Sequence, residues 1–423
     1  MSPAVEAPPK PPLAGERSPG DIIDLCRALA ERFAPRASTY DREARFPREN
    51  FEDLRAAGLP VLMVPRQFGG LGATFFTYTR AIERLAVGDA STALAFNMHN
   101  IAVGSLAGLE LDSIEGRRGR ATAAFRDWLF GEARRGKFFA AASSEPNAGP
   151  RLSAVRTNYR RTRRDDTDGF VLNGVKSFVS LSGFADYYLI AARPADPPAS
   201  DPGSTPSVSY FAIEASNPAM RFDNVWDTMG MRATSSNNMY LEDCFVPADR
   251  LFLGIEGTAL YHAIREPHWL AGGYNGVYLG LADAIFDFTT RCLREKKNPT
   301  TGEPLSNDRL IQHQVGRMSV ALEAARAVTY DAARLVDAAR GSPEANEAIH
   351  RAKYLVSELA PQLASDAMRL CGGRSIFRSQ PLERYYRDAR CGGLMPATSD
   401  ECLVYVGKLN LGFDARSSAV SYW

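Results

Sequence analysis

The spacing of hydrophobic residues changes twice along the chain, and this change constrains the fold more than any other feature. From residue 21 onward, apolar side chains recur at helical intervals, as in Ile22, Leu25, Leu29 and Phe33. From about residue 137 they form short β-rich runs between polar turns, which is typical of a small barrel. Helical spacing then returns. The sequence therefore predicts an α+β multidomain protein with helical domains flanking a β-barrel.

These patterns divide the chain into four segments. Residues 1–19 contain six prolines and no hydrophobic periodicity, so we expect a disordered tail. Residues 20–136 are predicted to form an N-terminal α-helical domain, and residues 137–254 a small β-barrel domain. Residues 255–423 are predicted to form a C-terminal four-helix bundle. The stretches long enough for bundle helices are 271–293, 311–339 and 344–370.

Composition argues against several classes of protein. The net charge of +1 gives no bulk attraction to nucleic acid. No apolar run approaches the length of a membrane span, and no signal peptide opens the chain. The six cysteines are scattered without a Cys-x-x-Cys pair. We therefore expect reduced thiols in a cytoplasmic protein, and no metal site.

Two glycine-punctuated segments stand out in the β-rich region. Residues 140–149 read Ala-Ala-Ala-Ser-Ser-Glu-Pro-Asn-Ala-Gly, and residues 168–180 read Asp-Gly-Phe-Val-Leu-Asn-Gly-Val-Lys-Ser-Phe-Val-Ser. Each leads from a strand into a polar turn whose hydroxyl and backbone N–H groups could face a flat, hydrogen-bonding ligand. The alternative is a pair of antiparallel strands with Asn-Gly and Asp-Gly turns, which needs no ligand.

The combination and order of these segments resemble the acyl-CoA dehydrogenase superfamily. The resemblance runs from about residue 20 to residue 415 and includes further matches at residues 64–72, 229–234 with 246–250, 371–373 and 381–390. It implies a flavoprotein that holds FAD and assembles as a homodimer or homotetramer. It also implies an acyl-CoA or acyl-carrier-protein substrate, with a flavoprotein or oxygen as electron acceptor.

The resemblance assigns FAD contacts to residues of the middle domain. Ser143 and Ser144 match positions that contact the pyrimidine edge of the flavin. Phe178 takes the place of the tryptophan that stacks on the ring, and it keeps an aromatic face but has no indole donor. Ser180 replaces the threonine whose hydroxyl reaches flavin N5.

Further FAD contacts are implied in the C-terminal domain. His313 and Gln314 match a pair that reaches FAD across a dimer interface. Gly372 and Gly373 match glycines that lie close to the pyrophosphate of a neighbouring subunit, where a side chain would block the approach; an ordinary helix C-cap is the alternative. The last two implied contacts are Thr398 and Asp400.

Several positions depart from the family pattern. The Gly-Ser-Asp of the first flavin segment is Gly149-Pro150-Arg151 here, and Pro150 has neither a hydroxyl nor an N–H to offer a ligand. Arg369 stands where a glutamine is usual. The Arg-x-x-Phe-Gly element that helps to bind FAD phosphates is not clearly present near Arg294.

The usual catalytic base is missing. Desaturation of an acyl thioester removes a proton from Cα, and a carboxylate must lie within reach of it. In most family members this is the glutamate of a Tyr-Glu-Gly-Thr turn, eight residues after an Arg-Asp pair. Counting eight residues from Asp388 leads to Pro396, which cannot accept a proton.

Glu266 is the candidate replacement. Some family members carry the base within a Leu-Glu-Arg-x-x-x-Ala-Gly-Gly sequence, and residues 265–273 can be aligned with it without a gap. A competing alignment, anchored on residues 280–282, places Leu270 there instead. Glu266 could also be a carboxylate favoured at a helix start, just ahead of Pro267.

Three functions remain open from the sequence. The first, which we favour, is an FAD-dependent dehydrogenase of acyl thioesters that uses Glu266 or acts on a substrate with an acidic C–H. The second is a flavin monooxygenase or oxidase, because relatives that activate oxygen have lost the usual glutamate. Those relatives often carry a late histidine, and none follows His350 here. The third is a non-catalytic subunit of a mixed oligomer.

Overall fold

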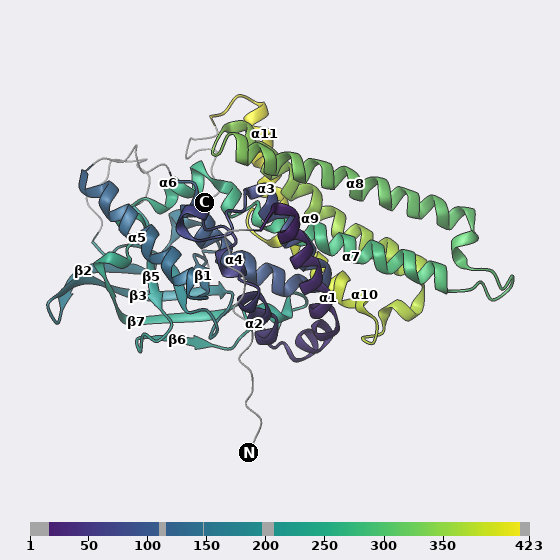
Figure 1. Cartoon of the computed structure of the whole chain (residues 1–423), viewed down its shortest axis with the longest axis horizontal. Helices are drawn as coiled ribbons and strands as arrows, with labels where there is room; N and C mark the ends of the chain where they lie inside the picture. The colour runs from purple at the N-terminus through teal and green to yellow at the C-terminus, as the bar shows by residue number, and fades with distance from the viewer. Residues whose placement is uncertain (1–16, 110–115, 147, 197–206, 415–423) are drawn as a thin grey trace, which may run out of the picture.

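The computed structural model describes residues 17–109, 116–146, 148–196 and 207–414. A curled sheet lies at one side, long helices extend from the other, and the N-terminal helices lie between them (Figure 1). The expected fold is therefore confirmed. Most of the predicted tail (residues 1–16) lies outside the described residues. None of the described helices is long and apolar enough to cross a membrane.

The N-terminal region is helical because its apolar stripes are bounded by capping residues. The first helix starts with a capping box, in which Ser18 and Asp21 each bind the backbone of the other, and with Pro19 at its first position. The helices are α1 (Pro19–Glu43), α2 (Arg48–Ala56), α3 (Phe75–Gly88), α4 (Ala90–Ala107) and α5 (Gly116–Arg134). Helix α4 is buried along nearly its whole length. It is the central helix of the molecule.

His99 of α4 joins the helical region to the sheet. Its Nε2–H donates to the carbonyl of Pro60 at 2.7 Å, and its Nδ1 accepts the N–H of Phe139 at 3.1 Å. Burial lowers the pKa of His99 to about 4, so the ring is neutral at physiological pH. His99 therefore has a structural role.

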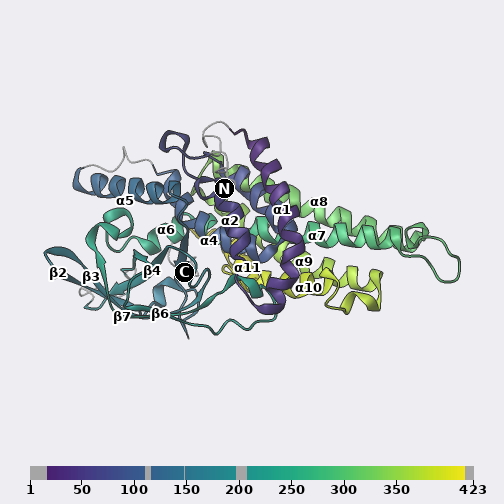
Figure 2. The same ribbon diagram turned by 60° about the horizontal axis from the view of Figure 1, so that its bottom comes forward.

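The middle region is one sheet with the strand order β1-β4-β2-β3-β7-β6, and β5 pairs with β4. Its strands are β1 (Phe139–Ala142), β2 (Asn158–Arg164), β3 (Thr167–Val179), β4 (Tyr187–Pro194), β5 (Ser209–Glu214), β6 (Met220–Asp223) and β7 (Asn237–Pro247). Helix α5 lies over one face (Figure 2), where Trp128 packs edge-on against Phe139 and Tyr187. The sheet is thus covered by a helix on that side.

Residues 229–234, whose resemblance is to strands that close the middle domain of the family, do not form a strand here. Residues 229–234 form a loop that ends in a 3-10 turn (Arg232–Thr234). Met231 within this loop (φ 53°) and Ser235 directly after it (φ 49°) both adopt left-handed backbone conformations, which interrupt the regular pleat of a strand. This loop and its neighbours form one wall of the site described below.

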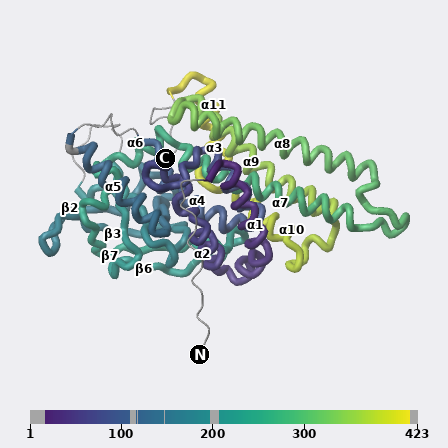
Figure 3. The backbone as a smooth tube through the Cα atoms, viewed as in Figure 1, coloured from purple at the N-terminus to yellow at the C-terminus, as the bar shows by residue number. Residues whose placement is uncertain are grey.

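The C-terminal region is built on three long helices. Helix α7 lies directly against α3, because a Cβ at Gly280 would come within 2.1 Å of the carbonyl of Glu83 and one at Gly276 within 2.6 Å of that of Thr79. The helices are α6 (Ala259–Arg265), α7 (Gly273–Glu295), α8 (Arg309–Ala338), α9 (Pro343–Cys371), α10 (Pro381–Arg390) and α11 (Ser399–Asn410). The chain trace shows that α10 returns to lie beside α1 (Figure 3).

A buried ionic cluster lies where α3, α7 and α8 meet. Arg326 binds the carboxylates of both Glu83 and Asp283, and the hydroxyl of Tyr330 donates to Glu83 at 2.6 Å. Burial raises the pKa of Glu83 to about 7, against the opposing effect of the nearby arginines. Arg84 pairs with the same two carboxylates, at 2.6 Å from Glu83 and 3.5 Å from Asp283, so two guanidinium groups compensate two buried acids.

We expect Arg326→Met to lower the free energy of unfolding by about 3 kcal/mol, because it leaves Arg84 as the one remaining guanidinium for two buried carboxylates. The matched control is Arg351→Met, which removes an exposed ion pair with Glu347 on α9 and should cost less than about 1 kcal/mol. Urea denaturation of the two variants and the parent measures both. Equal small losses would contradict the assignment of a structural role to the cluster.

Candidate active site

A cavity of about 450 Å³ lies where the three regions of the chain meet. Helix α4 contributes an apolar wall through Leu94, Met98 and Ile101. The opposite wall comes from the turn after β1, the end of β3, the loop before β7 and residues 391–401. Ser143, Ser144, Phe178, Ser180 and Thr398, from three separate segments, all line it. The cavity is the one place where these predicted contact residues gather.

A buried ion pair fixes the turn after β1 to the end of β3. The Lys176 Nζ lies 2.8 Å from an Oε of Glu145, and the two side chains are 0% and 4% exposed. Glu145 also accepts the backbone N–H groups of Arg156 at 2.7 Å and Thr157 at 2.9 Å. Burial lowers the pKa of Lys176 to about 8. The pair thereby holds the two serine-bearing segments in one register, with the Ser177 N–H donating to the carbonyl of Ser144 at 2.9 Å.

A chain of hydroxyl groups runs along the cavity wall from Ser180. Its Oγ lies 2.8 Å from that of Ser236, which lies 2.7 Å from Oγ1 of Thr234. The Thr234 hydroxyl donates to the carbonyl of Met231 at 3.0 Å. Because the chain ends on a carbonyl, Ser180 donates to Ser236 and keeps a lone pair for a donor in the cavity.

Phe178 presents an exposed aromatic ring beside the cavity. It is 64% exposed, and its backbone is left-handed at φ 55°. Such strain in a non-glycine residue is characteristic of functional sites. Trp226 contacts the ring edge-on, at 5.8 Å between centroids, and is fixed by an indole N–H bond to the carbonyl of Met231 at 3.0 Å. Trp226 was not predicted as a site residue from the sequence. The one indication was its position three residues before the 229–234 match.

Thr398 and Asp400 lie close together but face different environments. Thr398 caps α11, with its hydroxyl accepting the Glu401 N–H at 3.3 Å and its own N–H donating to the Glu401 carboxylate at 2.8 Å. Both Thr398 and Glu401 line the cavity. Asp400 is exposed in the first turn of the same helix.

Four other predicted contacts lie away from the cavity. His313 and Gln314 are near the start of α8, and Gly372 and Gly373 follow the end of α9, at the outer end of the long helices (Figure 1). Gly372 has φ 75°, which favours glycine, whereas a Cβ at Gly373 would meet nothing within 4 Å. Packing among the described residues therefore does not require Gly373 to be glycine. A single chain does not bring these four residues to the cavity.

The wall where a base would stand is apolar. Pro396 and Leu270 both line the main cavity, and Glu401 is the only carboxylate among its described lining residues. Glu266 instead lines a side chamber of about 70 Å³ that shares Ile101, Ala141 and Leu270 with the main cavity. Glu266 therefore lies next to the cavity rather than on its wall.

Two side chains already bind the Glu266 carboxylate. Arg340 donates to its Oε2 at 2.6 Å, and the Trp269 indole N–H donates to the same oxygen at 3.2 Å. Arg340 also donates to the carbonyl of Ser105 at 3.1 Å. Within the described residues, Oε1 of Glu266 has no hydrogen-bond partner. This carboxylate oxygen is therefore available to accept a proton or a hydrogen bond.

Comparison with known proteins gives the family. Models of the acyl-CoA dehydrogenase N-terminal, middle and C-terminal domains match residues 21–108, 140–244 and 273–398. Short-chain specific acyl-CoA dehydrogenase from Rattus norvegicus is 30% identical over 391 residues, or 92% of this chain and 89% of that protein. The putative acyl-CoA dehydrogenase YdbM from Bacillus subtilis is 29% identical over 375 residues, or 88% of this chain and 92% of that one.

Solved structures show the same fold. Butyryl-CoA dehydrogenase from Megasphaera elsdenii superposes with a TM-score of 0.78 at 24% identity, covering 93% of this chain and 98% of that chain. Dibenzothiophene monooxygenase TdsC from Paenibacillus sp. A11-2 superposes with a TM-score of 0.77 at 22% identity, covering 94% and 99%. The chain belongs to the acyl-CoA dehydrogenase family and is an FAD-dependent oxidoreductase.

The cavity suits such a cofactor, because it combines an uncovered aromatic ring with hydroxyl and backbone groups. We expect Phe178→Ala to weaken flavin binding about tenfold, the upper end of what an aromatic contact contributes. Phe178→Trp should preserve the affinity, since it keeps a stacking face. Titration of the flavin-free variants with FAD, followed by flavin fluorescence, measures this. An unchanged affinity of Phe178→Ala for FAD would show that the flavin ring does not stack on Phe178.

Proposed function

We propose that this protein desaturates an acyl thioester, with the acyl group carried by CoA or by a carrier protein. A proton leaves Cα for a base on the protein, hydride leaves Cβ, and an α,β-unsaturated thioester results. FAD supplies the hydride acceptor. The observation that carries the proposal is the convergence of Ser143, Ser144, Phe178, Ser180 and Thr398 on one cavity. Electrons would then pass to a flavoprotein or to oxygen.

The two sides of the cavity suit the two parts of this reaction. The apolar residues of α4, together with Leu270 and Met395, offer an unreactive surface for an acyl chain. The hydroxyl-bearing side suits a flavin, where Ser180 would meet N5 and Ser143 with Ser144 the pyrimidine edge. Ser143 is held for this role by a 2.9 Å bond to the hydroxyl of Tyr210.

Glu266 is our candidate for the base. Its position in the side chamber and its unpartnered Oε1 support the assignment, since a base must present a free lone pair near the substrate. Arg340 compensates the charge of the carboxylate in this partly buried place. Leu270 separates the two spaces, so the role requires substrate to extend past this side chain.

One observation favours a second function, a flavin-dependent monooxygenase or oxidase. Pro396 and Leu270 line the main cavity at the two positions aligned with the family's catalytic base, and neither side chain can accept a proton. Oxygen activation does not need a carboxylate there. The structural neighbours that are named monooxygenases share the fold, as do the named dehydrogenases.

Anaerobic mixing of the FAD-loaded protein with a panel of acyl thioesters tests the dehydrogenase. The expected result is loss of the visible absorbance of oxidised flavin with at least one thioester. Glu266→Gln should slow this step by at least ~100-fold, the usual scale for losing a general base. Pro396→Glu should restore part of the rate, because it returns a carboxylate to the position where the family usually carries its catalytic glutamate.

The control is Arg340→Gln, which removes the ion pair but keeps the carboxylate. It should retain most of the reductive rate if Glu266 is the base. Equal losses in both variants would show that the pair only holds the local structure. Failure of every thioester to reduce the flavin, together with oxygen consumption when reduced flavin is supplied, would favour the monooxygenase.

We also propose a homodimer or a dimer of dimers. The four predicted contacts at the outer end of the helices can reach a flavin only in another copy. Exposed apolar side chains support an interface, since Leu310 and Val320 of α8 are 78% and 72% exposed. Sedimentation at micromolar concentration should give a multiple of the 46.3 kDa chain mass. A species of single-chain mass would refute this.

A further inference from the structure

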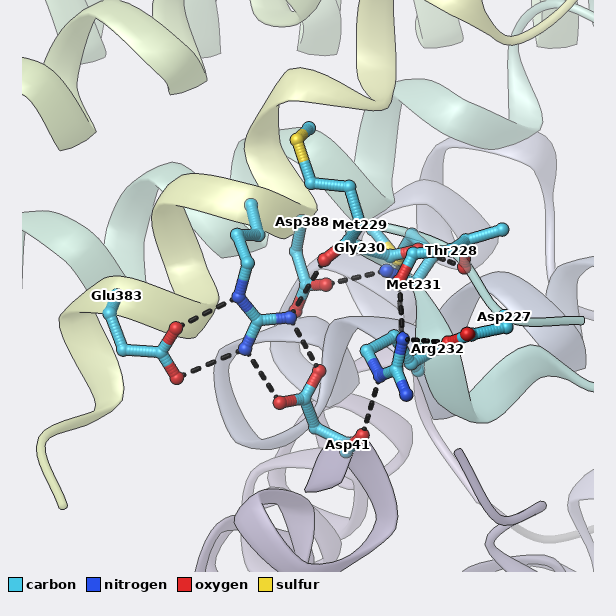
Figure 4. Close-up of polar contacts among 11 residues, drawn as sticks. Asp41, Asp227, Thr228, Met229, Gly230, Met231, Arg232, Glu383 and Asp388 are labelled. Atoms are coloured by element: carbon cyan, nitrogen blue, oxygen red, sulfur yellow. Dashed lines mark hydrogen bonds and ion pairs between the residues drawn. The ribbon is translucent and has the colours of Figure 1, made fainter. Parts of the chain in front are cut away.

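A second cavity, of about 700 Å³, lies beside the candidate flavin cavity. It is formed by α1, the loop 227–232, the end of α7 and the segment that leads into α10. Thr228 and Met229 line both cavities, so the loop is a shared wall. Figure 4 shows this loop with the charged side chains around it. We call this second cavity the arginine cleft.

Arginine dominates the lining of the cleft. Its charged residues are Arg42, Arg232, Arg291, Arg378, Arg384 and Arg387, against Asp41, Asp227 and Glu383. All three acids are already paired. The Arg387 guanidinium lies 2.6 Å from Asp41 and 2.8 Å from Glu383, and Arg232 lies 2.8 Å from Asp227 (Figure 4).

Four guanidinium groups are left over. Within the described ranges, Arg42, Arg291, Arg378 and Arg384 have no carboxylate oxygen within 4 Å. The first three are exposed, and their charges are solvated. Arg232 and Arg387 donate their N–H groups to acids of the same chain. The four unpaired arginines are therefore the guanidinium groups that can bind a ligand.

Arg384 is the unusual member of this set. It is only 7% exposed, and its guanidinium lies 5.2 Å from the ring centroid of Tyr385. The buried carboxylates of Asp89 and Asp388 interact with its charge at longer range. The Asp388 carboxylate is engaged by the N–H of Met231 at 2.6 Å. Burial raises the pKa of Asp388 to about 7, against the charge of Arg384. A buried cation without a close counterion is costly unless an anion completes it.

We propose that the arginine cleft binds a small organic molecule carrying a diphosphate group, at a site separate from the flavin cavity. A guanidinium group binds phosphate through two parallel N–H bonds, and four such groups more than offset the negative charge of a diphosphate. The volume accommodates a molecule of nucleotide size. Ser38, Ser379 and Gln380 line the same space and supply neutral hydrogen-bonding groups for the rest of the ligand.

The test uses the FAD-loaded protein, so that the flavin site is already filled. Calorimetric titration with ADP and with inorganic pyrophosphate, at constant ionic strength, should give saturable binding at one site per chain. Inorganic phosphate should bind more weakly, because it reaches fewer guanidinium groups. Arg42→Gln combined with Arg378→Gln should weaken ADP binding at least about tenfold, on the scale of a charge-assisted hydrogen bond. Both residues are exposed, so the fold should be unaffected.

The matched control is Arg118→Gln combined with Arg120→Gln. These are two exposed arginines of α5, on a different face of the molecule, and the change should leave ADP binding as it is in the parent. Absence of saturable binding in the parent would overturn the proposal. So would equal affinity in the cleft variant, or release of flavin on addition of ADP, which would place the binding in the flavin site. The result does not depend on which reaction the protein catalyses.

Discussion

The ion pair between Lys176 and Glu145 is the contact on which the candidate site depends. The two segments that bear the serines and the exposed phenylalanine come from different parts of the sheet, and this pair joins them. A buried ion pair adds little net stability, since desolvation of both charges offsets their attraction. Its value here is geometric: both charges find their partners only when the turn after β1 meets the end of β3 in one register.

The other walls of the cavity are held by contacts between domains. His99 fixes α4 to β1, and the glycines of α7 let it approach α3 closely. The loop before β7 is fixed in turn by α10, because a Cβ at Gly230 would come within 2.4 Å of the carbonyl of Arg387. The site is therefore a property of the domain arrangement, and no single domain contains it.

The sequence predicted the domain order and most elements because periodicity is local. The three long helices begin and end within a few residues of the predicted limits, as for 344–370 against Pro343–Cys371. Strand β2 was not predicted, because it is rich in arginine and only Tyr159 is fully buried in it. The loop at 229–234 was misread because its left-handed residues are not glycines.

The site was harder to predict than the fold because its contacts are not local. Arg387 and Asp41 lie 346 positions apart, and no pattern in a single sequence links them. The register around Glu266 and Leu270 was ambiguous for a related reason. The two residues are four positions apart in the short connection between α6 and α7, and only the packing determines which of them lines the main cavity.

Because the candidate flavin cavity is formed by all three domains, an empty cavity affects how well the protein resists proteolysis in the cell. A ligand that touches all three domains stabilises their arrangement by mass action, and this stabilisation is lost when the ligand is scarce. Without the ligand, the exposed ring of Phe178 would also leave apolar surface in contact with water. Riboflavin supply should therefore set how long each chain survives proteolysis, as well as how many chains are active.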